Sequence, residues 1–375
     1  MPTKQKKIKV LVIGKIGIYE DSRTSCFLSF LKKKNISFKY IKIPENIIKD
    51  LSLISLLNRR KFYSFFLVII FLKFNMHKNY YSKLIKFVSL LNINNYNYIY
   101  TYDIDTALGL SQIVKKKNII WDARDFYPMH FNQKMFWKYL YSSFYLKGIK
   151  KLTHKVKTFL TVSEGIKNMY EKILNNKFFL IYSLAKYEKL KPNRVSGKIK
   201  IIHHGICSKT RKIENYIETA KLLGKKYQIT CMLKITDLEY FRFLKNKASE
   251  VSNFEFMKPV KLFNIPKKIN NFDISLLITD SVSVNHLYSM PNKLFESIQA
   301  RLSIVATPSK EISKFLIKHK CGRVTKNYDL KNIAYTIKKI DDDKILNYKK
   351  KNDNISKKYS YRHNFDKFNK IFEYI

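Results

Sequence analysis

The chain has 375 residues, more than one typical domain holds and enough for two. Hydrophobic residues make up 46 % of it, which excludes a disordered or fibrous protein and is enough to fill two cores. Lysine and arginine number 73 against 28 aspartate and glutamate, giving a formal net charge of +45. Such a surplus favours a polyanionic neighbour, either nucleic acid or an anionic membrane surface. The lysines are spread over nearly every segment, however, and an AT-rich genome produces the same composition, so both explanations remain open.

Cysteine spacing and the first residues bear on the compartment. The four cysteines, at 26, 207, 231 and 321, are far apart and match no Cys-x-x-Cys metal spacing, so we expect idle thiols in a reducing compartment. The chain runs directly into a buried strand pattern, without a signal-peptide core and cleavage site. The sequence therefore predicts a cytoplasmic protein.

In chain order, period-2 apolar runs alternate with helical patterns. In the first half we expect strands at residues 8–13, 36–43, 97–102, 118–122, 158–162 and 178–182, and helices that include 23–33 and a long aromatic-rich stretch at 135–156. Residues 184–198 are polar and lysine-rich and are the predicted linker. Alternation then restarts, with strands at 199–203, 227–233, 253–256, 272–278, 302–306 and 323–325, and helices at 211–223, 237–250, 291–301 and 311–318 and near Pro266.

One segment, Phe62–Phe74, is intensely apolar and is flanked by Arg59, Arg60, Lys61 and Lys73. It is shorter than the roughly 20 residues that a membrane-spanning helix needs. Two interpretations remain open. The segment is either a helix buried in the core or a helix lying in a membrane interface, anchored by its basic and aromatic residues.

Repeated strand–helix alternation is typical of a parallel sheet covered by helices on both faces. Two such series predict an α/β protein of two doubly wound, Rossmann-like domains facing a central cleft. We place them at residues 1–185 and 198–345, with a C-terminal helical segment at 346–375. In such sheets ligands bind beyond the carboxyl ends of the strands, so polar residues just past strands are the site candidates.

The most informative run is 289–301, which opens a predicted helix at Pro291. Backbone N–H groups and the positive end of the helix dipole can hold a phosphate there. Lys293 puts a cation in the first turn, where it is unfavourable for the helix alone. Glu296 lies on the same face, where a carboxylate can accept both hydroxyls of a ribose. An ordinary amphipathic helix, with Lys293 and Glu296 as a surface pair, explains the same spacing.

The segment Met290–Glu296 (Met-Pro-Asn-Lys-Leu-Phe-Glu), followed by Ala300, the strand 302–306, Glu311 and Gly322, resembles the carboxyl-domain signature of glycosyltransferase family four. The resemblance runs from about residue 8 to residue 330. It implies the GT-B fold, a nucleotide-sugar donor, retention of anomeric configuration, and no metal or other cofactor. It also implies that the last helix crosses back to the first domain.

The family pattern has two glutamates eight residues apart, and this sequence matches only the second. That second glutamate, implied to bind the donor ribose, falls on Glu296, whereas the first, implied to contact the sugar, falls on Tyr288. Ser289-Met290-Pro291 replaces the glycine-rich turn between them. This is similar to a subset with a Pro-Asn-Lys signature that is associated with bacterial surface polysaccharides.

A second match lies at residues 201–206, where the family's strand-to-glycine turn approaches the donor pyrophosphate. Gly205 allows the pyrophosphate to approach the backbone closely, and Arg211 offers a bidentate fork to phosphate. Lys209 or Lys212 is the candidate for a second basic residue. The adjacent histidines 203 and 204 are either metal ligands or residues that pack a cleft wall. The implied donor site consists of Gly205, Arg211, Tyr288, Met290, Pro291, Asn292, Lys293 and Glu296.

In the first half, the matches lie at predicted strand ends. Asp21 begins an Asp-x-Arg that is similar to one near the acceptor side, although it also fits a helix N-cap. Residues 121–128 resemble the family's Asp-Ala-His-Asp segment, with Arg124 in place of the histidine. An arginine can orient a phosphate or a sugar hydroxyl but cannot act as a base. The candidate catalytic residues are therefore Asp125 and Asp103 as bases, with Arg124.

The sequence thus predicts a glycosyltransferase, peripheral on the inner face of the plasma membrane, acting in surface polysaccharide synthesis such as that of lipopolysaccharide. Its expected partners are a nucleotide-sugar donor, a glycan or lipid-linked acceptor and the membrane surface, and not nucleic acid. Two alternatives remain. One is a nucleic-acid-binding protein that uses the basic surface, although no helix-turn-helix, zinc or RNP-type motif is present. The other is a non-catalytic GT-B partner subunit, which the tyrosine at position 288 allows.

Overall fold

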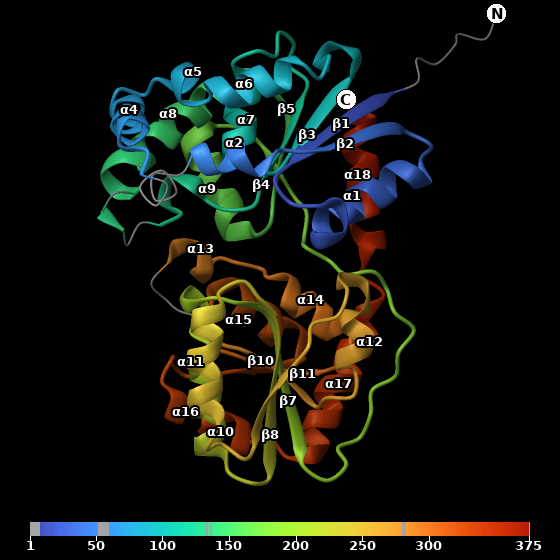
Figure 1. Cartoon of the computed structure of the whole chain (residues 1–375). Helices are drawn as coiled ribbons and strands as arrows, with labels where there is room; N and C mark the ends of the chain where they lie inside the picture. Colours follow the sequence, from blue (N-terminus) through green and yellow to red (C-terminus); the bar gives the residue numbers. More distant parts are fainter. Residues whose placement is uncertain (1–7, 52–59, 132–133, 136, 280–282, 375) are drawn as a thin grey trace, which may run out of the picture. The chain divides into compact units, whose positions relative to one another are not determined.

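The computed structural model describes residues 8–51, 60–131, 134–135, 137–279 and 283–374. The chain divides into two compact units (Figure 1). Unit 1 comprises residues 1–182, 282–285 and 367–375, and unit 2 comprises residues 183–281 and 286–366.

Unit 1 is built on a six-stranded sheet of order β2-β1-β3-β4-β5-β6, in which every neighbouring pair is parallel. The chain winds from β1 to one side and then to the other, so the switch point lies between β1 and β3. The strands are β1 (Lys9–Gly14), β2 (Ser37–Lys42), β3 (Tyr98–Thr101), β4 (Ile119–Ala123), β5 (Val156–Thr161) and β6 (Phe178–Leu180).

Polar residues just past the strands of unit 1 begin its helices. Asp21, Asp103 and Ser163 each accept a hydrogen bond from the backbone N–H three residues on, at the starts of α1, α7 and α9, respectively. The helices are α1 (Ser22–Lys33), α2 (Glu45–Asp50), α4 (Phe62–Lys73), α5 (His77–Tyr80), α6 (Ser82–Ser89), α7 (Ile104–Ser111), α8 (Ser142–Leu152) and α9 (Glu164–Leu174). Short turns of 3-10 helix lie at Ile18–Glu20, Ile93–Asn95 and Tyr127–Met129.

Unit 2 repeats the design with the order β12-β11-β10-β7-β8-β9, again all parallel. Its switch point lies between β7 and β10. The strands are β7 (Ile199–Cys207), β8 (Tyr227–Ile235), β9 (Phe254–Met257), β10 (Ile274–Leu277), β11 (Ser303–Ala306) and β12 (Gly322–Val324).

Helices cover both faces of this sheet because neighbouring residues of a strand point to opposite sides. Ile201 of β7 packs in one cluster with Ile217 and Ile333, whereas Ile202 packs in another with Ile269 and Ala300. The helices of unit 2 are α10 (Glu214–Leu223), α11 (Leu238–Ala248), α12 (Ile265–Ile269), α14 (Asn292–Gln299), α15 (Lys310–His319), α16 (Leu330–Lys338) and α17 (Asp342–Ser356). The residues of α13 (Val284–Leu287) are divided between the two units. Turns of 3-10 helix lie at Lys209–Arg211 and Leu262–Asn264.

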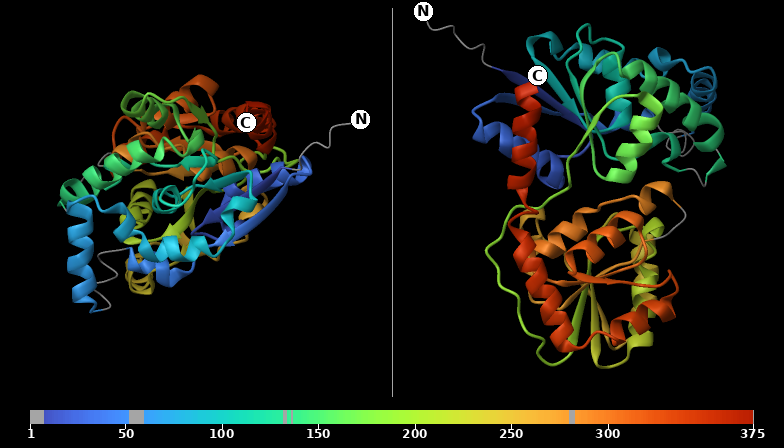
Figure 2. Two further views of the ribbon diagram at one scale, coloured as in Figure 1. Left: turned by 90° about the horizontal axis from the view of Figure 1, so that it is seen from above. Right: turned by 180° about the vertical axis from the view of Figure 1, so that it is seen from behind.

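The last helix, α18 (Tyr361–Tyr374), belongs to unit 1 from residue 367 onward (Figures 1 and 2). Aromatic rings hold it there. The Phe368 ring lies 5.1 Å from that of Phe27, and the Phe372 ring lies 5.5 Å from that of Phe30. The C-terminal segment therefore adds apolar contacts to α1.

One expectation needs correction. The stretch 135–156 is not one helix: a π-helix at Trp137–Tyr141 precedes α8, and Val156 already begins β5. Ring stacking accompanies the wider π turn, with Trp137 4.8 Å from Tyr141 between ring centroids. The predicted linker, residues 184–198, forms no helix or strand. Arg301 Nη2 donates to the Glu188 carbonyl at 2.8 Å and so ties this segment to unit 2.

Candidate functional site

A buried carboxylate lies on α14. The helix buries Leu294, Phe295 and Ile298, yet Glu296 is also only 4 % exposed. Its Oε2 lies 2.8 Å from Nε2 of His204, which is 3 % exposed and comes from β7. The surface-pair interpretation of Glu296 is therefore wrong, because its partner is a buried histidine from another element.

The hydrogen bond assigns one ring nitrogen of His204 as a donor. An ionised carboxylate only accepts, so His204 donates from Nε2 to Glu296. The other ring nitrogen, Nδ1, is buried and has no hydrogen-bond partner in the part of the chain that the structure describes. A buried polar atom of this kind is costly to leave unpaired and can form a hydrogen bond with a ligand.

Gly205 and Lys293 fit closely together. A Cβ built on Gly205 would lie 2.7 Å from Cε and 2.9 Å from Nζ of Lys293. The φ angle of Gly205, +150°, is also one that side-chain-bearing residues rarely adopt. Glycine at this position therefore makes room for the lysine ammonium. The sequence predicted a turn at Gly205. Gly205 lies instead within β7, because the pairing of β7 with β8 continues to Cys207.

The Lys293 ammonium has no ion-pair partner among the described residues. Burial, followed by repulsion from Arg211, lowers the pKa of Lys293 to about 8, although Glu296 acts in the opposite direction. Arg211 is exposed in the 3-10 turn that follows β7. Two cations, Lys293 and Arg211, therefore accompany one carboxylate, Glu296. Such an excess of positive charge is what an anion-binding site needs.

His203 adds a second buried imidazole. Its ring lies 4.0 Å from that of Tyr216, its Nδ1 is 3.5 Å from the Leu276 carbonyl, and its buried Nε2 has no partner among the described residues. Burial lowers the pKa of His203 well below its usual value, and the nearby Lys293 lowers it further. His203 is therefore uncharged at neutral pH.

The loop that leads into α14 contains the remaining predicted donor residues. Met290 is buried, and Asn292 is the first residue of α14. Pro291 is the N-cap, with an extended ψ of 153°, and not the first helical residue as expected. The Tyr288 hydroxyl accepts a hydrogen bond from Lys310 Nζ at 2.8 Å, so its side chain is turned onto α15.

In unit 1, a buried ion pair lies at the carboxyl end of β4. Arg23, 1 % exposed, donates from Nε to Oδ2 of Asp122 at 2.7 Å and from Nη2 to Oδ1 of the same carboxylate. Asp122 is 0 % exposed and also accepts from the Tyr100 hydroxyl at 2.7 Å. A bidentate pair of this kind fixes both side chains.

Arg124 extends this network. It donates from Nη2 to Asp21 at 2.8 Å and from Nε to Asp122 at 3.2 Å, and its guanidinium lies 4.1 Å above the Tyr102 ring. Burial acts to raise the pKa of Asp21, but the charge and hydrogen bond of Arg124 outweigh it, and the pKa is lowered. Asp21 also caps α1, and Nη2 of Arg124 donates a further hydrogen bond to the Thr24 hydroxyl at 3.0 Å.

The two predicted bases differ in how free their oxygens are. Asp103 caps α7 through Thr106 N at 2.9 Å and pairs with Lys15 at 3.0 Å. Asp125 is 38 % exposed at its side chain, with Oδ2 3.5 Å from Nδ1 of His130. Asp125 is therefore the more accessible carboxylate. Neither His130 nor Lys15 was among the predicted site residues.

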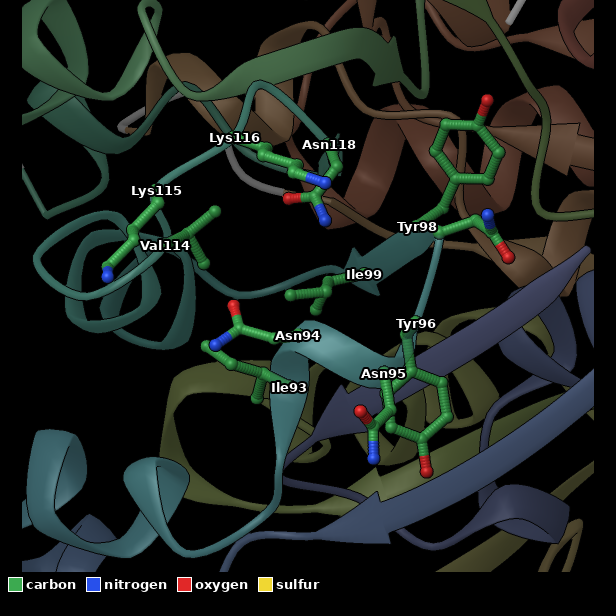
Figure 3. Close-up of a pocket in the computed structure, with 11 residues that line it drawn as sticks. Ile93, Asn94, Asn95, Tyr96, Tyr98, Ile99, Val114, Lys115, Lys116 and Asn118 are labelled. Atoms are coloured by element: carbon green, nitrogen blue, oxygen red, sulfur yellow. The ribbon is translucent and has the colours of Figure 1, made fainter.

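Unit 1 also contains a cavity, away from the residues described above. It has a volume of about 400 Å³ and lies between the loops at 93–98 and 114–118, at the amino ends of β3 and β4 (Figure 3). Asparagine, tyrosine and lysine side chains line much of it. Asp103 and Asp125 follow the carboxyl ends of these strands, so the cavity is separate from the candidate site. No group of three or more His, Cys, Asp or Glu among the described residues is arranged to hold a metal.

No protein-family model and no curated protein matches the chain. Solved structures do match its fold. HepE from Anabaena, in complex with UDP, aligns with a TM-score of 0.64 and 11 % identity over 98 % of this chain and 100 % of its own. An E. coli trehalose-6-phosphate protein bound with UDP-2-fluoro glucose aligns with a TM-score of 0.69 and 10 % identity over 98 % and 99 %.

Sucrose-phosphate synthase from Thermosynechococcus elongatus aligns with a TM-score of 0.68 and 9 % identity, over 98 % of each chain. The predicted GT-B fold, with two doubly wound parallel sheets, is therefore confirmed. At these identities the likeness shows the fold alone. Membership of glycosyltransferase family four stays a prediction.

Proposed function

We propose that the protein is a glycosyltransferase that takes its sugar from a nucleotide-sugar donor held by unit 2. The observation that carries this proposal is the buried Glu296, held by His204 on the same helix face as the Lys293 ammonium. This combination offers an acceptor for ribose hydroxyls and a cation for a diphosphate about one helical turn apart. Complexes with UDP and with UDP-2-fluoro glucose among proteins of the same fold support this assignment.

The chemistry follows from these charges. The bond between the sugar C1 and the diphosphate oxygen breaks, and a bond forms between C1 and the acceptor oxygen. Lys293 and Arg211 stabilise the negative charge that develops on the leaving diphosphate. The acceptor proton passes to the departing phosphate oxygen or to Asp125, the accessible carboxylate of unit 1. We propose that transfer retains the anomeric configuration and uses no metal or other cofactor.

We propose a lipid-linked or membrane-associated glycan as the acceptor, at the inner face of the plasma membrane, in surface polysaccharide synthesis. The net charge of +45 supports an anionic membrane surface as the place where the protein acts. The Met290–Glu296 signature supports a role in surface polysaccharide synthesis. None of the helices that the structure describes is both long and apolar enough to traverse a bilayer. The form of membrane association that we propose is peripheral attachment.

The test is thermal stabilisation by UDP, GDP, CMP, dTDP and ADP, with wild type and Glu296→Ala. A ligand at 100 times its dissociation constant adds about 2.7 kcal/mol, which is easily seen. A selective shift by one nucleotide that is lost in Glu296→Ala supports the donor site. No shift with any nucleotide contradicts it. Binding without turnover of matched donors and acceptors would favour the non-catalytic partner subunit, for which the Tyr288–Lys310 contact is the structural argument.

A further inference from the structure

The most apolar helix of unit 1 turns its aromatic side outward. In α4 only Val68 and Leu72 are buried, so the prediction of a buried core helix at residues 62–74 is wrong. Phe66 is 62 % exposed and Tyr63 is 78 % exposed. In Figures 1 and 2, α4 lies on the outside of unit 1. A protein that leaves such a helix face uncovered in water is carrying an interaction surface.

The exposed side chains of α4 lie on one face. At 100° per residue, Phe62, Tyr63, Phe66, Ile70 and Phe74 fall within an arc of about 120°. The two buried residues, Val68 and Leu72, fall on the opposite side, which packs against unit 1. A helix exposed only to water has the reverse arrangement, with polar residues outward. This face is therefore suited to an apolar environment.

A neighbouring segment extends the face. The π-helix at Trp137–Tyr141 packs beside α4. Met135 and Tyr139, just before and within it, are 74 % and 67 % exposed. We call the exposed apolar residues of the two segments the α4 patch: Phe62, Tyr63, Phe66, Ile70, Phe74, Met135 and Tyr139.

The charge around the α4 patch has one sign. Between Asp50 and Asp103 the sequence contains no acidic residue, although an even spread of 28 over 375 residues would place about four there. The same holds between Asp125 and Glu164, the stretch that contains the π-helix. Lysines border the aromatic side chains, and Lys138 Nζ lies 5.8 Å from the Tyr139 ring centroid.

We infer that the α4 patch is the site at which unit 1 docks on an anionic lipid bilayer. Exposed phenyl and tyrosyl rings enter the interface between headgroups and acyl chains, and the lysines around them meet acidic headgroups. The charge selects this occupant over a second copy of the chain, since two patches of the same sign repel each other. The inference rests on the proposed function for its setting, a membrane-bound acceptor, but its test does not need catalysis.

The test is sedimentation of the full-length protein with phosphatidylcholine vesicles, with and without phosphatidylglycerol. We expect binding only to the anionic vesicles. Phe66→Ser with Ile70→Ser should weaken that binding by about tenfold or more. Lys73→Glu with Lys138→Glu should weaken binding to the anionic vesicles by about fivefold for each unit of positive charge removed. The matched controls are Leu238→Ser with Phe243→Ser, two exposed positions on α11 in unit 2, and they should bind as wild type does.

Three outcomes would overturn the inference: no binding to anionic vesicles, equal binding of the α4 patch variants and wild type, or a dimer of wild type in solution that the Phe66 and Ile70 substitutions dissociate. Nucleotide stabilisation of the same variants separates this inference from the proposed function. If the α4 patch variants lose vesicle binding but keep the nucleotide shift, both proposals stand. If wild type binds vesicles through the patch and shows no nucleotide shift, only the donor proposal fails.

Discussion

The Glu296 carboxylate and the His204 imidazole form a buried pair, with 2.8 Å between Oε2 and Nε2, across 92 residues of sequence. The pair joins α14 to β7 beside the switch point of unit 2. The histidine holds one carboxylate oxygen in place. A fixed orientation of the group that we propose to bind ribose lowers the cost of binding.

His204→Phe tests this positioning. The substitution leaves Glu296 buried without its donor, so the free energy of unfolding should fall by about 1–3 kcal/mol. Nucleotide affinity should fall as well, because the carboxylate is no longer held. His203→Phe is the matched control: it keeps the ring packing on Tyr216 and should leave nucleotide affinity near wild type. Equal nucleotide affinity of His204→Phe and wild type, measured by calorimetry, would exclude the positioning role.

Lys293 should make nucleotide binding depend on pH. Its pKa is about 8, so the ammonium carries its charge below that pH and loses it as the pH rises through 8. The dissociation constant of the nucleoside diphosphate should therefore rise by about tenfold between pH 7 and 9.5. Lys293→Arg keeps its charge throughout and should flatten this dependence. An unchanged affinity of wild type across this range would show that Lys293 does not contact the phosphates.

Gly205→Ala tests the fit between β7 and Lys293. The added Cβ would overlap Lys293 Cε and Nζ, so the ammonium must move and nucleotide affinity should fall by about tenfold. Gly197→Ala is the control, because its φ is also positive, at +72°, but nothing lies within 4 Å. Both variants should lose about 1 kcal/mol of stability from backbone strain. Loss of nucleotide binding in both would refute the specific role of Gly205.

Substitutions of Asp125 and Asp103 should differ in their effects on the transfer rate and on stability. Asp125→Asn should lower the transfer rate by about 10²–10⁴-fold and leave nucleotide affinity unchanged, since its side chain is exposed and not committed to a cap. Asp103→Ala removes the cap of α7 and should cost about 1 kcal/mol of stability. Initial rates and thermal unfolding of both variants give the comparison. A transfer rate of Asp125→Asn equal to that of wild type would exclude Asp125 as the base.

Much of the fold could be predicted from local pattern. Runs such as Val10–Ile13 are fully buried strands, and polar residues after them, such as Asp21 and Asp103, cap helices as their residue types favour. The pattern failed where packing between distant segments decides. Gly205 continues a strand because β8 pairs with it, and the π-helix at Trp137–Tyr141 occurs among stacked rings.

The candidate site was only partly predictable for the same reason. The signature around Met290–Glu296 identified the residues of α14, but it gave no sign that His204 would be the partner of Glu296. Two adjacent histidines just before Gly205 were the available signal, and their role depends on the position of β7 beside α14. The outward face of α4 was also undecided, because a uniformly apolar helix has no pattern that says which side is covered.

The most direct test of the central claim is calorimetric titration with the nucleoside diphosphate that stabilises the protein best and with its 2′-deoxy form, on wild type and Glu296→Gln. A ribose hydroxyl bound by a carboxylate contributes about 1.5–3 kcal/mol, so wild type should prefer the ribonucleotide by about tenfold or more. Glu296→Gln, which keeps the shape of the side chain, should lose most of that preference. A wild type that binds both forms equally would contradict the assignment of Glu296 as the ribose-binding residue of a nucleotide-sugar site.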